Sequence, residues 1–197
     1  MFRRIELEKG ENIASVSFEL EEGTDLTKEL ETQAFKKYQK LESTRGWVIS
    51  EMNNIELFIE QIIIHSYFNF SQNIERELFK ENILKQRFCT LASKRKMLEG
   101  IQKSELFKDE FSLTNKELSA YIQSLEKLTK IRNEFGHNQI AIQIPDMVGV
   151  LKYSKDGKER NKELSEEYLT NLRALHSEVL RITLTLMNET IEIQKNT

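Results

Sequence analysis

The hydrophobic positions of the chain follow two different periods along its length. Near the N-terminus, Val16, Phe18 and Leu20 alternate with polar residues, and a period of two is typical of a β-strand. A shorter apolar alternation precedes them, and the Gly-Glu-Asn sequence at residues 10–12 is suited to a turn between the two strands. We therefore expect residues 1–23 to form a small β appendage.

From Thr24 onward the period changes to that of amphipathic helices. Apolar residues recur every three or four positions, which predicts helices over residues 25–44 and 47–69, separated at Gly46. The second helix is apolar on more than one side, so it should be central. The same pattern predicts two shorter helices, or one bent helix, over 73–86 and 88–103. The capping residues predict further helices from the Thr114–Glu117 capping box to Gly136 and from Ser165 onward.

Residues 139–162 interrupt the helical pattern. Ile140, Ile142 and Ile144 alternate with other residues, and the Lys-Asp-Gly-Lys sequence at 155–158 is typical of a hairpin turn. We expect a short β excursion or an ordered loop here. The final helix has a seam of apolar residues that packs either on the central helix or on a second subunit. The expected fold is thus mainly α, with residues 24–197 forming a bundle of four to six helices.

Composition and charge favour a helix-rich domain that is not a general nucleic-acid coat. The chain has 197 residues, 39% hydrophobic and 31% charged, with one proline and a net charge of −3. Since nucleic-acid coats are usually strongly basic, any contact with RNA must be local. Residues 80–103 are locally basic, and Lys94, Arg95 and Lys96 within them are candidate RNA-binding residues. The alternative is that these side chains line an ordinary solvated helix face.

Several classes of site are disfavoured by what the sequence contains. A single cysteine, Cys89, allows neither an internal disulfide nor a cysteine-rich zinc site, and a buried structural thiol is expected. The three histidines are scattered and no phosphate-binding loop is present, so no metal or cofactor is expected. The N-terminus lacks an apolar signal core, and the apolar segment 55–70 is interrupted by charges. We therefore expect a cytoplasmic protein with no membrane contact.

One cluster combines residues suited to catalysis: Arg132, Asn133 and His137, near the end of a predicted helix. Asn133 and His137 are four residues apart and share a helix face, whereas Arg132 interrupts an otherwise apolar row. Histidine can move protons near neutral pH, and arginine can neutralise a phosphorane. Asparagine can hold a phosphate or orient the histidine. RNA supplies its own nucleophile, the ribose 2′-hydroxyl, so these residues could cut RNA without a metal.

An Arg-Asn-x-x-x-His motif at the end of a helix resembles the signature of the HEPN superfamily. The resemblance extends more weakly to the apolar helix 47–69 and to the segment 93–98. Together these segments and the motif cover about residues 47–137. It implies a helical bundle that forms a homodimer, with the motif of each subunit lining a shared cleft. It also implies a ribonuclease that leaves 2′,3′-cyclic phosphate ends, in a toxin–antitoxin or antiviral defence system, and catalytic roles for the three motif residues.

Some toxins of this family carry a tyrosine two positions after the histidine, where a partner enzyme modifies them. This chain has Gln139 there, so we do not expect silencing by that modification. Other family members are catalytically silent, so a module that binds RNA or a partner protein, such as an antitoxin, is the alternative, and a purely structural bundle is a third. His65 is expected to be a core histidine, although Glu56 or Glu60 on the same helix could orient His137.

Overall fold

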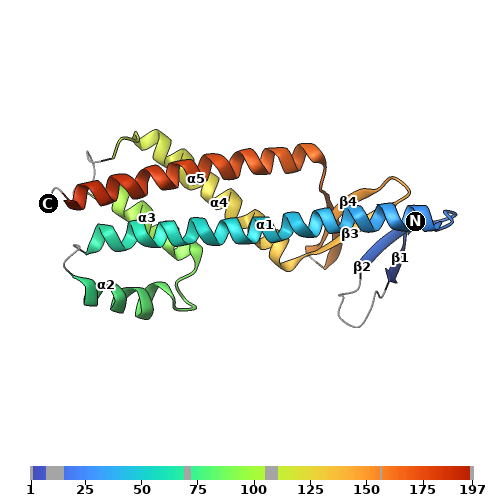
Figure 1. Cartoon of the computed structure of the whole chain (residues 1–197), viewed down its shortest axis with the longest axis horizontal. Coiled ribbons are helices and arrows are strands. Elements are labelled where there is room, and N and C mark those ends of the chain that lie inside the picture. Colours follow the sequence, from blue (N-terminus) through green and yellow to red (C-terminus); the bar gives the residue numbers. More distant parts are fainter. Residues whose placement is uncertain (1, 8–15, 69–71, 105–110, 156, 196–197) are drawn as a thin grey trace. The chain divides into compact units, whose positions relative to one another are not determined.

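The computed structural model describes residues 2–7, 16–68, 72–104, 111–155 and 157–195 (Figure 1). Its elements in chain order are β1 (Phe2–Leu7), β2 (Val16–Glu21), α1 (Lys28–Tyr67), α2 (Asn73–Phe79), the π-helical turn η1 (Lys80–Leu84), α3 (Leu91–Lys103), α4 (Asn115–His137), β3 (Gln139–Ile144), β4 (Val148–Lys155), β5 (Lys158–Glu163) and α5 (Glu166–Lys195). The fold is mainly α-helical with a small β part, as the sequence predicts.

The chain divides into two compact units. The sheet unit consists of Met1–Ser50 and Arg132–Leu172, and the bundle unit consists of Glu51–Ile131 and Arg173–Thr197. Helices α1, α4 and α5 each contribute one part to either unit. The two β segments that the sequence suggests as separate features, at the N-terminus and after α4, both belong to the sheet unit.

The sheet unit contains one five-stranded sheet in the order β1-β2-β3-β4-β5. Strands β2 and β3 are parallel, with Phe18 opposite Ile142, and the other neighbouring pairs are antiparallel. Phe18 and Ile142 are both fully buried, which places them in the core of this unit. The predicted hairpin between β4 and β5 is confirmed, with Gly157 at φ 71°. The predicted turn at residues 10–12 lies outside the described residues.

Helix α1 runs through Gly46, so the predicted break there is wrong. Leu41 and Val48 on either side are 2% and 3% exposed, and they continue one buried stripe across the glycine. A glycine inside a helix costs about 1 kcal/mol relative to alanine, which a continuous apolar stripe outweighs. Helix α4 ends at His137, within one residue of the end predicted at Gly136.

The core of the bundle unit is formed by apolar residues of its long helices. Ile55, Ile59 and Ile62 of α1 are fully buried, which confirms that this helix is central. Each such side chain contributes about 1.5–3 kcal/mol through burial. Helix α5 packs in the same unit, where the Tyr121 hydroxyl of α4 and the Thr183 hydroxyl of α5 are 2.9 Å apart. Burial raises the pKa of Tyr121 to about 12.

The predicted caps set the beginnings of two helices. The Thr114 backbone N–H and hydroxyl both donate to the Glu117 carboxylate, at 2.8 and 2.7 Å, and the Thr114 hydroxyl accepts from the Glu117 backbone N–H. The Ser165 hydroxyl accepts from the Tyr168 backbone N–H at 3.1 Å. Among the described helices, none combines the length and the apolar character that a bilayer span requires.

Candidate functional site

Arg132, Asn133 and His137 lie in the last turns of α4, in the sheet unit and directly before β3. Since successive helix residues are about 100° apart, Asn133 and His137 lie within about 40° of each other and roughly opposite Phe135. Phe135 is fully buried, and Asn133 and His137 are both exposed. The two polar side chains therefore share one face of α4, and that face is open to solvent.

Arg132 lies beside the buried row of α4 rather than in it. Leu128, Ile131 and Phe135 continue the row at a helical spacing and are at most 6% exposed, whereas Arg132 is half-buried. The expectation that Arg132 interrupts this row is therefore wrong, because Ile131 fills that place. The Arg132 guanidinium instead reaches its neighbour, and its Nη1 donates to the Asn133 Oδ1 at 3.2 Å.

His137 is the proton-transfer group of the motif, and its side chain is exposed. Within the part of the chain that the structure describes, its imidazole has neither a hydrogen-bond nor an ionic partner. Both ring nitrogens are thus available to a ligand. The Arg132–Asn133 hydrogen bond occupies the Asn133 carbonyl oxygen and leaves its amide N–H groups to bind an acceptor.

Two further charged side chains flank the motif in the sheet unit, and the sequence analysis did not identify them. Lys162 of β5 donates to the Glu134 carboxylate at 2.6 Å and lies 4.7 Å from the centre of the Tyr168 ring. Burial opposes the charge on Lys162, but its contacts with Glu134 and Tyr168 outweigh this and raise its pKa. Glu134 lies between the motif residues in the sequence, so its lysine partner ties this turn of α4 to β5.

Arg45 of α1 is the second flanking residue. Its Nη2 donates to the backbone carbonyl oxygen of Asn138, directly after the motif, at 2.6 Å, and its Nη1 lies 3.2 Å from the Glu42 carboxylate. The negative end of α4 is thus met by a cation from another helix. This contact could not be predicted from the sequence, because 93 residues separate Arg45 from Asn138.

The candidate RNA-binding residues of α3 have different environments. Lys94 is 4% exposed, and its ammonium donates to Glu56 and Glu60 of α1. Arg95 lies 2.8 Å from the Glu126 carboxylate of α4, whereas Lys96 is exposed. Lys94 is therefore bound to carboxylates of the bundle unit rather than presented to solvent, and Lys96 is the exposed residue of the three.

The Lys94 contacts also decide the roles of Glu56 and Glu60. Burial alone would lower the pKa of Lys94, but the hydrogen bonds to both glutamates raise it. Glu60 is 5% exposed, so its charge requires this partner. Both glutamates are thus partners of Lys94 within the bundle unit, whereas His137 belongs to the sheet unit.

The other two histidines and the cysteine are buried in the bundle unit. His65 is 7% exposed, with its Nδ1 3.2 Å from the Gln194 Oε1, which confirms it as a core histidine. His176 is 7% exposed, 3.5 Å from the Glu51 carboxylate, and burial lowers its pKa. Cys89 is buried as predicted. No group of three or more potential metal ligands comes together among the residues that the structure describes.

Comparisons of this chain with protein-family models, with curated proteins and with solved structures found no match.

Proposed function

We propose that the protein is a metal-independent endoribonuclease of the HEPN type. The observation that carries the proposal is the placement of Asn133 and His137 on one exposed face at the end of α4, with Arg132 bonded to Asn133 beside them. The last turns of α4 thus carry a proton-transfer group and an amide on an exposed face, with a permanent cation beside them. This is the set of groups that RNA transesterification needs.

The nucleophile of the proposed cleavage reaction is the ribose 2′-hydroxyl of the RNA substrate. His137 accepts the proton from this hydroxyl as its oxygen attacks the adjacent phosphorus, so that the O2′–P bond forms and the P–O5′ bond breaks. Arg132 binds the negative charge that develops on the phosphorane oxygens, and the Asn133 amide N–H groups donate to one of them. A protonated histidine gives its proton to the leaving 5′-oxygen. The products are a 2′,3′-cyclic phosphate and a 5′-hydroxyl.

A second copy of the chain supplies the second histidine in this account. The exposed face of α4 offers one imidazole per chain, and the reaction needs both a base and an acid. A two-fold dimer that places the same patch of each copy against the other would bring two His137 side chains and two Arg132 side chains to one phosphate. The homodimer is therefore part of the proposal, as are RNA as substrate and a toxin or defence role under an inhibitory partner protein.

The proposal is tested by incubating labelled single-stranded RNA with the protein in the presence of a chelator. The His137→Ala variant should lose about 10²–10⁴-fold in cleavage rate because it removes proton transfer. The Arg132→Ala variant should show a comparable loss of cleavage rate. Arg132→Lys should retain part of the rate, because an ammonium keeps the positive charge but cannot make the two parallel hydrogen bonds of a guanidinium. Arg160→Ala, at an exposed arginine of β5, is the matched control and should cleave normally.

The result depends on all variants remaining folded, which is the expected outcome because His137 and Arg160 are exposed and Arg132 lies outside the buried row of α4. Circular dichroism should show the same helix content in each. Full cleavage by His137→Ala would show that the activity comes from another site or another protein. A DNA strand of the same sequence lacks the nucleophile and should survive in every reaction.

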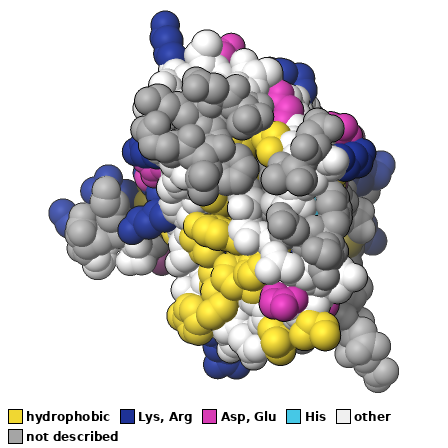
Figure 2. Space-filling view, turned by 90° about the vertical axis from the view of Figure 1, so that its left-hand side faces the viewer, with side chains coloured by type: hydrophobic (Ala, Val, Ile, Leu, Met, Phe, Trp, Pro, Cys, Tyr) yellow, Lys and Arg dark blue, Asp and Glu magenta, His cyan; other side chains and the backbone are white. Residues whose placement is uncertain are grey.

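An exposed apolar surface favours a second candidate function, a silent module that binds a partner protein. Helix α2 has no buried residues, and its Ile74 and Leu78 are 74% and 56% exposed. Phe88 is 68% exposed. Figure 2 shows hydrophobic side chains gathered on one face of the molecule. Exposed apolar patches of this kind commonly mark interaction surfaces. Binding of a partner without any RNA cleavage by the wild-type protein would favour this alternative.

A further inference from the structure

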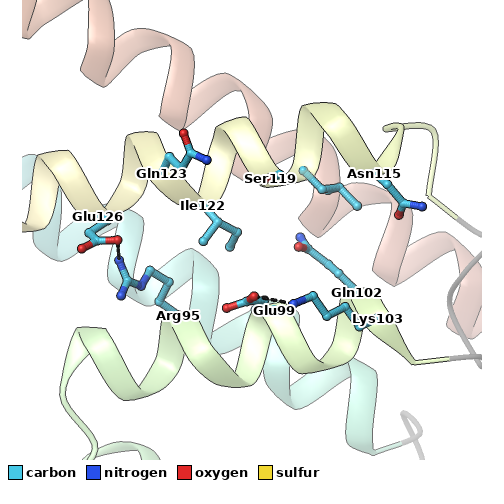
Figure 3. Close-up of a pocket in the computed structure, with 10 residues that line it drawn as sticks. Arg95, Glu99, Gln102, Lys103, Asn115, Ser119, Ile122, Gln123 and Glu126 are labelled. Atoms are coloured by element: carbon cyan, nitrogen blue, oxygen red, sulfur yellow. Dashed lines mark hydrogen bonds and ion pairs between the residues drawn. The ribbon is translucent and has the colours of Figure 1, made fainter.

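A pocket lies between α3 and α4, entirely within the bundle unit (Figure 3). Its volume is about 600 Å³, which is in the range of sites for small molecules. Leu118 and Ile122 of α4 supply apolar surface, and the amide side chains of Gln102, Asn115 and Gln123 supply polar atoms. None of these residues has a part in the proposed ribonuclease site.

Gln102 is the residue that indicates a ligand. It is 7% exposed, and its Nε2 has no hydrogen-bond partner among the described residues. Figure 3 shows its amide group pointing from α3 into the space between the two helices. A buried amide without a partner is destabilising, and such groups are rare in folded proteins. A bound molecule with a hydrogen-bond acceptor would satisfy it.

The charges around the pocket favour a neutral ligand. Arg95 lies 2.8 Å from Glu126, and Lys103 lies 2.6 Å from Glu99. The two cations that line the pocket are therefore matched by two anions, and a charged ligand would find no uncompensated partner. The Arg95 guanidinium, held by its glutamate, still offers a flat surface on which a planar ring can stack.

We propose that this pocket binds a neutral nitrogen heterocycle with an amide-like edge, as found in the nucleobases uracil and guanine. A carboxamide side chain can pair with such an edge through one donated and one accepted hydrogen bond, the same two-bond pairing that Asn and Gln make with the donor and acceptor of adenine. The Gln102 Nε2 donates to the ring carbonyl oxygen, and the ring rests against Ile122. The inference uses residues separate from those of the proposed cleavage site and stands without it.

The binding test is a titration of the isotope-labelled full chain with uridine and guanosine, followed by NMR of the side-chain amide signals. The Gln102 amide signal should shift with either nucleoside. N3-methyluridine, whose amide-like edge is blocked, should bind more weakly, and benzene, which has no acceptor, should not shift this signal. No shift with any nucleoside at millimolar concentration would overturn the proposal.

Two variants locate the site. Ser119→Trp places a large ring at an exposed position of the pocket wall and should abolish binding. Gln102→Leu should weaken binding by up to about tenfold, the effect of one hydrogen bond. It should also raise the melting temperature, since it removes an unpartnered buried amide. Gln33→Leu, at an exposed glutamine outside the pocket, is the control. Unchanged affinity in Ser119→Trp would place binding elsewhere, and unchanged affinity in Gln102→Leu would refute the role of its amide.

A competition experiment distinguishes a free nucleoside from a base within an RNA strand. If short oligouridine displaces uridine and shifts the Gln102 amide signal, the pocket takes a base of a strand. If oligouridine leaves the uridine complex intact, the pocket takes the free nucleoside. Both outcomes agree with the proposal, whereas oligouridine binding that also survives in Ser119→Trp would mean that the strand is bound at another surface.

Discussion

Replacing Lys94 by methionine should be among the most damaging single changes in the bundle unit. The lysine is 4% exposed, and its ammonium is hydrogen-bonded to Glu56 and Glu60. Methionine fills a similar volume but removes the charge. The 5% exposed Glu60 is then left as a buried carboxylate without its cation, and Glu56, whose side chain is 26% exposed, is left beside it.

Removing one partner of a buried ion pair destabilises a protein by about 3–5 kcal/mol. In a chain of this length, each kcal/mol lowers the melting temperature by about 2–4 °C, so a fall of about 6–20 °C is expected. The two hydrogen bonds raise the pKa of Lys94 above its ordinary 10.5, so the stabilisation is complete at neutral pH and is lost only as the pH rises through the raised value.

The measurement is urea unfolding followed by circular dichroism. Lys96→Met, the same substitution at an exposed position on the same helix, should change the free energy of unfolding by less than about 0.5 kcal/mol. Adding Glu60→Leu to Lys94→Met should restore part of the loss, because the buried unpaired charge is then removed. A loss below about 1 kcal/mol in Lys94→Met would refute the view that this lysine compensates a buried carboxylate.

Four further substitutions test the fold. Gly149→Ala should lower the free energy of unfolding, measured in urea, by about 1–3 kcal/mol, because a Cβ there would lie 2.3 Å from the Leu41 Cδ1. Gly100→Ala, at an open helix position, should raise the free energy of unfolding by up to about 1 kcal/mol. Thr114→Ala removes the cap of α4 and should lower the free energy of unfolding by about 0.5–2 kcal/mol, which the same titration measures. Burial lowers the pKa of His176 below 6.5, so the unfolded chain binds more protons than the folded chain, and the free energy of unfolding should fall as the pH drops below about 6.5. His176→Gln should weaken this dependence of stability on pH, which melting curves at several pH values measure.

The sequence predicted the features that depend on neighbouring residues. Helical spacing identified the buried stripe through Ile55 and Ile59, and local capping patterns placed the starts of α4 and α5. The same kind of reasoning gave the surface position of the motif pair, since Asn133 and His137 are four residues apart on one helix. The predicted break at Gly46 was wrong because glycine weakens a helix without ending it when the apolar stripe continues on both sides.

Contacts between distant segments could not be predicted in this way. The parallel pairing of Phe18 with Ile142 joins strands that are more than a hundred residues apart, and neither strand specifies its partner by composition. The sequence shows Lys94 only as one member of a basic stretch, whereas in the structure its ammonium donates to a glutamate 34 residues earlier. Lys162 likewise donates to Glu134 of the motif helix, a contact that its own sequence position does not predict. A single sequence shows the charge of such residues but not which residues they contact.

The most direct test of the central claim is the chemistry of the RNA ends that the wild-type protein produces in the presence of a chelator. Mass spectrometry of the fragments distinguishes the possible products. The proposed roles of Arg132 and His137 predict fragments with 2′,3′-cyclic phosphate and 5′-hydroxyl ends, and their loss in His137→Ala. Fragments with 3′-hydroxyl and 5′-phosphate ends, or intact RNA from a dimer that is fully folded, would contradict a ribonuclease built on this motif.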